Sequence, residues 1–165
     1  MAALPRLLFV LVLVVVPVLV YATTGTLPER VATHFGRGGL ANGWMTRDGY
    51  LVFMLAFTTL VPLFVVAMTG LIPRMATSQG MVANREYWLA PPRREDTLAW
   101  LASHACWLGL TLSVFLGAVH LLVLEANARV PARLDEAYLF ALLGVLVVAV
   151  LAWAIGLRTR FRKAD

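Results

Sequence analysis

The residues of this chain best suited to chemistry near neutral pH are its three histidines, His34, His104 and His120. An imidazole can transfer a proton or ligate a metal. With Asp48 and Glu125, His34 and His120 would supply four donors for a divalent metal if the fold brought them together. None of them has the close spacing of a metal-binding motif, so we expect no metal site. We expect instead that a hydrogen bond from His34 pins its loop onto the helices.

His104 and His120 lie 16 residues apart in one apolar segment. In a helix they would be about 24 Å apart along the axis, which excludes a shared metal or haem. Ionisable residues at membrane depth are functional candidates by default. Each of these two lies toward one end of its segment, near water, and we expect both to pack as neutral polar groups.

The sequence contains no Gly-x-Ser-x-Gly, His-Glu-x-x-His, P-loop or Cys-x-x-Cys motif. Its one cysteine, Cys106, provides no disulfide framework. No nucleophile has a base beside it in an obvious pattern. We therefore expect a protein that is not an enzyme, with no catalytic residues, no cofactor and no metal.

The elements that must position these residues are strongly apolar. The chain of 165 residues is 61% hydrophobic and 14% charged, with a mean hydropathy of +0.81. Four stretches without Asp, Glu, Lys or Arg each have the roughly 20 residues needed to cross a bilayer, and apolar runs in lipid form helices. We predict one all-α integral membrane domain, residues 1–165. Its transmembrane helices are expected at about 7–22, 50–72, 97–124 and 137–157, with loops at 23–49, 73–96 and 125–136.

The distribution of positive charge predicts the orientation. Nine Arg and Lys residues fall on the side of both termini and loop 73–96, among them Arg74 and Lys163, against five on the other side. The positive-inside rule then puts both termini in the cytoplasm and loops 23–49 and 125–136 outside. Basic residues beside the membrane are attracted to anionic lipid, which explains the net charge of +5. We therefore expect the lipid bilayer as a partner and no nucleic acid.

The first outward loop holds the most specific polar sequence, LPERVATHFGRGGLANGW, from Leu27 to Trp44. Two alternatives stay open. Thr26 and Glu29 have the spacing of a capping box, which would start an interfacial helix. Otherwise VATHF is extended, and GRGG and the Asn-Gly pair make turns back toward Trp44. In both cases we expect Phe35 and Trp44 to lie against the membrane interface.

Two further sets of residues suggest contacts. In the inner loop, Asn84, Tyr87 and Trp88 precede a Pro-Pro pair that starts the third helix, and suit either a membrane anchor or a partner-docking site. In the third helix, small residues recur every four positions, which allows another helix to approach closely. They are Gly109, Ser113 and Gly117, and the pattern does not choose between an intramolecular seam and a dimer face.

The two loops resemble a known family. The first has a Leu-Pro pair, a His followed by an aromatic residue, a glycine-rich turn and a final aromatic residue, here Leu27, Pro28, His34, Phe35, Gly39, Gly43 and Trp44. This pattern is similar to the bacterial domain of unknown function numbered sixteen forty-eight, although Ala32 stands where the family often has proline. The resemblance covers roughly residues 5–100 and includes NREYWLAPPRRED in the inner loop. It implies a small bacterial inner-membrane protein.

The same domain occurs in SdpI-type immunity proteins, which protect a producing cell from a secreted membrane-active peptide and are linked to a transcriptional repressor. Those proteins carry further helices that this sequence lacks. The leading hypothesis is a membrane protein whose outward loop recognises a ligand such as a secreted peptide. The second is an accessory subunit of a larger complex with another membrane protein, and the third is a small transporter. The sequence does not predict the oligomeric state.

Overall fold

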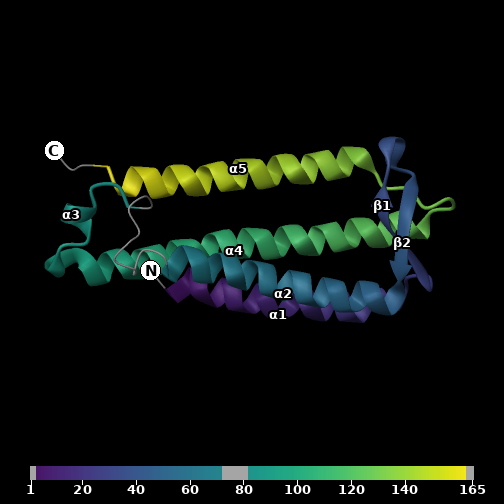
Figure 1. The fold of residues 1–165 in the computed structure, drawn as a ribbon, viewed down its shortest axis with the longest axis horizontal. Helices are drawn as coiled ribbons and strands as arrows, with labels where there is room; N and C mark the ends of the chain where they lie inside the picture. The colour runs from purple at the N-terminus through teal and green to yellow at the C-terminus, as the bar shows by residue number, and fades with distance from the viewer. Residues whose placement is uncertain (1–2, 72–81, 163–165) are drawn as a thin grey trace.

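The structure, a computed structural model, describes residues 3–71 and 82–162 (Figure 1). Its elements follow in chain order: α1 (Ala3–Thr24), β1 (Arg30–Phe35), a short 3₁₀ turn η1 (Arg37–Gly39), β2 (Ala41–Thr46), α2 (Arg47–Leu71), α3 (Arg85–Trp88), α4 (Pro91–Ala128) and α5 (Glu136–Arg160). The predicted end of the second helix at 72, the start of the inner loop with Arg74, and Lys163 lie outside the described residues.

Within the described part of the chain, α1, α2, α4 and α5 are long and apolar enough to cross a membrane. The chain is thus a multi-pass membrane protein, as its composition predicts. The helices extend beyond the predicted spans, most of all α4, which begins at Pro91 rather than 97 and has 38 residues. Its length of about 57 Å exceeds the hydrocarbon core of about 30 Å. Charged residues therefore continue the helix outside the apolar layer, and the spans alone could not predict its ends.

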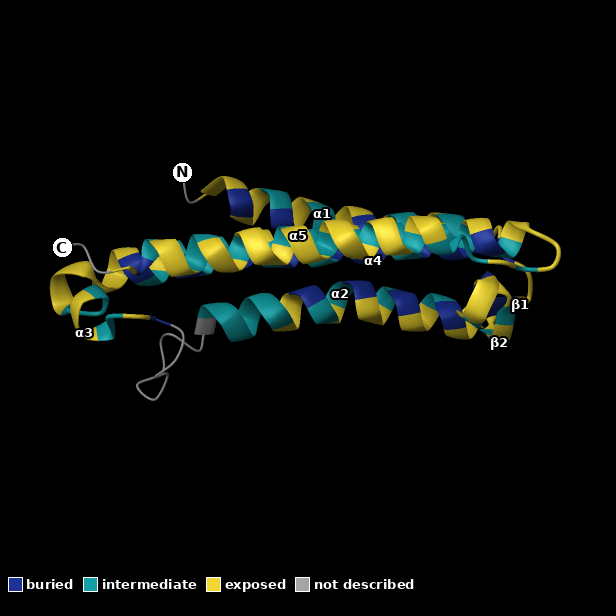
Figure 2. Cartoon of the chain, turned by 90° about the horizontal axis from the view of Figure 1, so that it is seen from above, coloured by how far each residue is buried: buried dark blue, intermediate teal, exposed yellow. Residues whose placement is uncertain are grey.

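The four long helices run side by side, with α4 in the middle (Figure 1). α1 and α2 pack on α4 and on each other, and α5 packs on α4. Both termini and α3 lie at one end, which we call the terminal end, and the two strands lie at the other, the hairpin end (Figure 1). Helix α5, which is described in full, has no buried residue, and Figure 2 shows exposed residues along its length.

The small residues of α4 lie in the seam with α1 and α2. A methyl group added at Gly109 would collide with Val66 of α2 and with Phe9 of α1, and one added at Gly117 would lie 3.2 Å from Val16. Ser113 is fully buried between them and returns its hydroxyl proton to the Gly109 carbonyl at 2.9 Å. Of the two alternatives left by the sequence, this arrangement is the intramolecular seam.

The loop between α1 and α2 is a β-hairpin, residues 30–46, with β1 antiparallel to β2. The interfacial-helix alternative is therefore wrong, and the extended alternative is correct for residues 30–35. The turn comes at the glycines, where Gly38 and Gly39 have φ of 76° and 74°, values that favour glycine. The Asn42–Gly43 pair does not form a turn, because it lies inside β2 beside two irregularities in the register.

An apolar cluster joins the hairpin to the helices. Its buried members are Val16, Val20, Leu27, Val31, Tyr50, Met54 and Val123, which come from α1, the hairpin and its approach, α2 and α4. A second cluster of Val82, Leu101 and Phe161 lies at the terminal end. The side chain of Val31 is completely buried, and this explains why a short β-branched segment stays extended instead of forming a helix.

Candidate functional site

The hairpin is held on α4 by one side chain, Asn127. Its Oδ1 accepts the Ala32 N–H at 2.8 Å, and its Nδ2 donates to the Ala32 carbonyl at 3.0 Å. The same Nδ2 donates to the Val123 carbonyl at 2.9 Å. The amide thus takes the place of a neighbouring strand and satisfies both polar groups of a buried residue, which would otherwise be costly.

The tip of the hairpin is held by the loop between α4 and α5. The Leu134 N–H donates to the Gly39 carbonyl at 2.8 Å, and a methyl group added at Gly39 would collide with the Leu134 carbonyl oxygen. The loop runs beside the turn like a short third strand. Further bonds join Ala41 N–H to the Ala132 carbonyl at 3.2 Å, Gly38 N–H to Glu136 Oε1 at 3.0 Å, and Arg133 Nε to the Gly38 carbonyl at 2.8 Å.

The base of the hairpin is fixed to the start of α2. The Arg47 N–H donates to the Glu29 carbonyl at 2.9 Å, and its guanidinium donates to the Leu27 carbonyl at 3.2 Å. The Leu27 side chain is buried. The hairpin is therefore attached to the rest of the chain at its base, at its buried strand and at its tip.

The predicted loop residues divide into two groups. Leu27 and Gly39 are buried and fix the hairpin. Pro28, His34 and Trp44 are exposed, Trp44 at 49%, and Phe35 is half-buried. The exposed residues lie on this attached hairpin and are not buried in the core of the protein.

His34 does not pin the loop onto the helices, so that prediction is wrong. Its Nδ1 lies 3.4 Å from the hydroxyl of the adjacent Thr33. Its ring packs across the strand, where a methyl group added at Gly43 would come within 3.0 Å of the His34 Cβ. Asn127, which belongs to no motif that could be recognised in the sequence, makes the attachment instead.

A buried polar triad lies beneath the hairpin, where Tyr50, Thr23 and His120 meet from three helices. The Tyr50 hydroxyl lies 2.8 Å from His120 Nδ1, and Thr23 Oγ1 lies 2.7 Å from Nε2. His120 is fully buried, and its ring stacks on that of Tyr50 at 5.8 Å. Thr23 also donates to the Leu19 carbonyl at 2.7 Å.

The triad defines which nitrogen of His120 carries the proton. A threonine hydroxyl has one hydrogen, and Thr23 uses it on the Leu19 carbonyl. Thr23 Oγ1 must then accept the Nε2–H, and in a neutral imidazole Nδ1 accepts the Tyr50 O–H. Both nitrogens of His120 have a partner, an arrangement that suits the neutral polar packing expected from the sequence.

The four residues considered for a metal do not meet. Among residues 3–71 and 82–162, no three His, Cys, Asp or Glu side chains are grouped as metal ligands. His34 is exposed on the hairpin and His120 is enclosed in the triad. Glu125 pairs with Arg129, one turn along α4. His34, Asp48, His120 and Glu125 therefore do not converge on one site in the structure.

At the terminal end, the inner-loop residues pack on α5. Asn84 Nδ2 donates to the Phe161 carbonyl at 3.0 Å, and the Trp88 ring meets that of Phe161 edge-on at 5.7 Å. The Arg160 guanidinium lies 4.4 Å from the centre of the Trp88 ring. Tyr87 is 43% exposed. Asn84 and Trp88 thus contact the end of α5, while Tyr87 has the Arg93 guanidinium 4.1 Å from the centre of its ring.

His104 lies at the contact between α4 and α5. Its ring stacks between Trp100 at 4.5 Å and Trp153 at 5.0 Å. His104 Nε2 lies 3.0 Å from the Trp153 carbonyl oxygen, and the indole N–H of Trp153 donates to the His104 carbonyl at 2.9 Å. This reciprocal pair joins α4 to α5. Because His104 and Trp153 are 49 positions apart in the chain, no local pattern in the sequence indicates this contact.

The comparisons with known proteins match part of this site. Residues 8–60 match the family model described as a domain of unknown function, DUF1648. The matched segment includes most of α1, the hairpin and the first part of α2, and so contains the residues from Leu27 to Trp44 that carry the resemblance in the first loop. It ends before the inner loop, which the resemblance had included. No curated protein and no solved structure matches the chain.

Proposed function

We propose that the chain is a non-enzymatic protein of a bacterial inner membrane that binds a ligand outside the cell through its hairpin. Both termini would then lie in the cytoplasm. The observation that carries this proposal is the exposure of Trp44 and Leu40, each at 49%, on a hairpin attached to the helices at three places. A preformed surface loses less conformational freedom on binding, and exposed aromatic residues are typical binding anchors.

The class of ligand follows from the strand geometry. In the described sheet β2 pairs with β1 along one edge, and the loop after α4 covers the start of its other edge, at Ala41. A strand at the edge of a sheet can pair with an extended peptide through its backbone, while side-chain contacts give specificity. We propose a peptide that reaches the membrane interface, with His34 and Trp44 beside it. An immunity-like role against a secreted membrane-active peptide would use this surface.

The test is photo-crosslinking in the producing cells. A benzophenone amino acid at position 44 should give adducts with a secreted peptide or an envelope protein, identified by mass spectrometry. The same probe at Leu60, an exposed residue in the middle of α2, is the matched control and should give lipid adducts.

Variants of the hairpin complete the test. The combined change His34→Ala and Trp44→Ala should reduce binding of the captured peptide at least tenfold, with the protein still inserted and folded. Lipid adducts alone at position 44, or unchanged binding by the double variant, would contradict the proposal.

A second candidate, an accessory subunit, is favoured by the exposure of α5. Because Gly109, Ser113 and Gly117 are covered by α1 and α2, a partner helix would dock on α5 instead. A cysteine at Val147, which is 55% exposed, should then crosslink to a stoichiometric membrane partner, whereas one at Leu142, in the face toward α4, should not. Recovery of the monomer alone would exclude this candidate. The transporter alternative has the least support, since His104 and His120 are both engaged in hydrogen bonds.

A further inference from the structure

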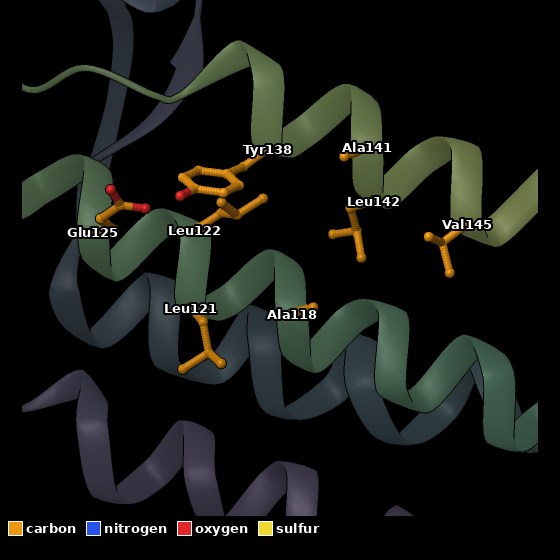
Figure 3. A pocket seen from close by; sticks show the side chains of 8 residues that line it. All are labelled: Ala118, Leu121, Leu122, Glu125, Tyr138, Ala141, Leu142 and Val145. Carbon is orange, nitrogen blue, oxygen red and sulfur yellow. The ribbon is translucent and has the colours of Figure 1, made fainter.

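An apolar groove lies between α4 and α5 near the hairpin end (Figure 3). Its volume is about 560 Å³, within the range of roughly 300–1,000 Å³ that is usual for small-molecule sites. The wall on α4 is Ala118, Leu121, Leu122 and Glu125, and the wall on α5 is Tyr138, Ala141, Leu142 and Val145. All of these residues except Glu125 lie within the predicted spans 97–124 and 137–157, so we expect the apolar part of the groove to open into hydrocarbon.

The polarity of the groove changes along its length. Figure 3 shows Glu125 and Tyr138 together at one end, with Ala118 and Val145 toward the other. On α4, Ala118 and Glu125 are seven positions apart, a distance of about 10 Å along the axis. The apolar part can therefore hold a length of hydrocarbon chain, with the polar end next to the membrane surface.

A second hollow, of about 320 Å³, lies next to the polar end, since its Ala137 precedes Tyr138 of the groove and its Arg129 pairs with Glu125. It lies between the hairpin tip, the loop after α4 and the start of α5, and is lined by Gly38, Arg129, Arg133, Leu134, Asp135, Glu136 and Ala137. Both signs of charge are present. Arg129 pairs with Glu125 below it and lies 3.8 Å from Asp135 above it. The two hollows thus lie one after the other, the apolar one between α4 and α5 and the charged one beyond it at the loop after α4, and together we call them the path.

We propose that this path is a binding site for one zwitterionic phospholipid, with an acyl chain in the groove and the headgroup in the charged hollow. The phosphate would lie near Arg129 and Arg133, and the ammonium group near Glu125 and Asp135. This pairing follows from charge complementarity, because an anionic headgroup would meet the carboxylates without a cation of its own. The site is independent of the ligand-binding face of the hairpin.

Selectivity must come from the headgroup. Lipid chains are as apolar as leucine, so hydrocarbon gains little by leaving the bilayer for the groove. Charged groups at the mouth are half-exposed, with Arg129 at 40% and Glu125 at 45%, and can rearrange around a headgroup. The groove then positions the chain, and the charges decide which lipid stays.

The experiment uses the full chain in phosphatidylcholine nanodiscs that contain a small fraction of phosphatidylethanolamine with a diazirine on its acyl chain. Phosphatidylglycerol with the same chain is the anionic comparison. Adducts are mapped by mass spectrometry. Labelling by phosphatidylethanolamine should concentrate on residues 118–125 and 138–145 and exceed that by phosphatidylglycerol at least threefold. Labelling spread evenly over the exposed faces of α1, α2 and α5, or equal for both lipids, would overturn the proposal.

Matched variants separate the groove from the surrounding bilayer. Ala141→Phe fills the groove and should reduce its labelling at least fivefold, while Ala154→Phe, on the opposite face of α5, should leave it unchanged. Glu125→Gln tests the headgroup and should reduce the preference for phosphatidylethanolamine without abolishing labelling. Equal labelling of the two phenylalanine variants, or an unchanged preference in Glu125→Gln, would also overturn the proposal. His34→Ala with Trp44→Ala should leave the labelling unchanged, which distinguishes this site from the hairpin.

Discussion

At the scale of single residues, the buried hydroxyl of Tyr50 illustrates how polar groups fix the helix register. It contacts His120 Nδ1, and Thr23 contacts Nε2, so three helices are joined at one ring. A buried group left without its partner costs more than the net strength of the bond that was lost. The triad therefore specifies which face of each helix meets the others.

We predict that Tyr50→Phe destabilises the protein by about 1–3 kcal/mol, because Nδ1 of a buried imidazole loses its donor. The control is Tyr21→Phe, whose ring is 70% exposed, and which should change the stability by less than about 0.5 kcal/mol. Denaturant unfolding in one detergent compares the two variants. Equal stabilities would show that the triad does not hold the helices.

At the scale of elements, the hairpin depends on close contact with the loop after α4. Gly38 and Gly39 share a positive φ, yet a Cβ atom would meet a neighbour only at Gly39. A methyl group at Gly38 would meet nothing within 4 Å, whereas one at Gly39 would collide with the Leu134 carbonyl. Variants of the two glycines can therefore distinguish the cost of backbone strain from the cost of losing the contact with the loop after α4.

Gly38→Ala should cost roughly 1–2 kcal/mol from the left-handed conformation alone. Gly39→Ala should cost about 1–3 kcal/mol more, because the Leu134 hydrogen bond is also lost. Hydrogen exchange measures this directly. The amides of Leu134 and Ala41 should lose protection in Gly39→Ala and keep most of it in Gly38→Ala, and similar loss in both variants would contradict the contact.

The spans could be predicted because each depends on a local property, a long run without charge. The hairpin could be predicted only as one of two alternatives. Its conformation depends on Asn127, which lies 95 residues from its partner Ala32, and on Glu136, which lies 98 residues from Gly38. Periodicity within a loop contains no information about contacts at such separations. The same limit applies to the pairing of His104 with Trp153.

The candidate site was predicted in part for the same reason. Exposed His34 and Trp44 come from a loop whose composition already marked it as unusual. Thr23 and Tyr50 looked like ordinary residues at helix ends, and only the packing of three helices gives them a common partner. A residue type indicates what a side chain can do, while the fold decides what it meets.

At the scale of the whole molecule, the two ends differ in architecture. Both termini and α3 lie at one end and the hairpin lies at the other (Figure 1). The positive-inside rule predicts which end faces the cytoplasm, and the proposed ligand surface requires the hairpin to lie outside. Orientation is thus a direct requirement of the function.

Cysteine labelling tests this orientation in a Cys106→Ala background. Val130→Cys lies in the loop after α4, where Val130 is 100% exposed, and should react with a membrane-impermeant maleimide in intact cells. Glu86→Cys, at the other end, should react only after permeabilisation. The reverse pattern would place the hairpin in the cytoplasm and exclude an extracellular ligand.

Helix α5 is tied to the rest of the chain near both of its ends, by Glu136 at the hairpin and by Trp153 at His104. Between these ties it has no buried residue. We therefore expect the middle of α5 to move away from α4 more easily than its two attached ends. The width of the groove between α4 and α5 would then vary with this motion. Loss of either attachment should let that end of α5 move out into the bilayer.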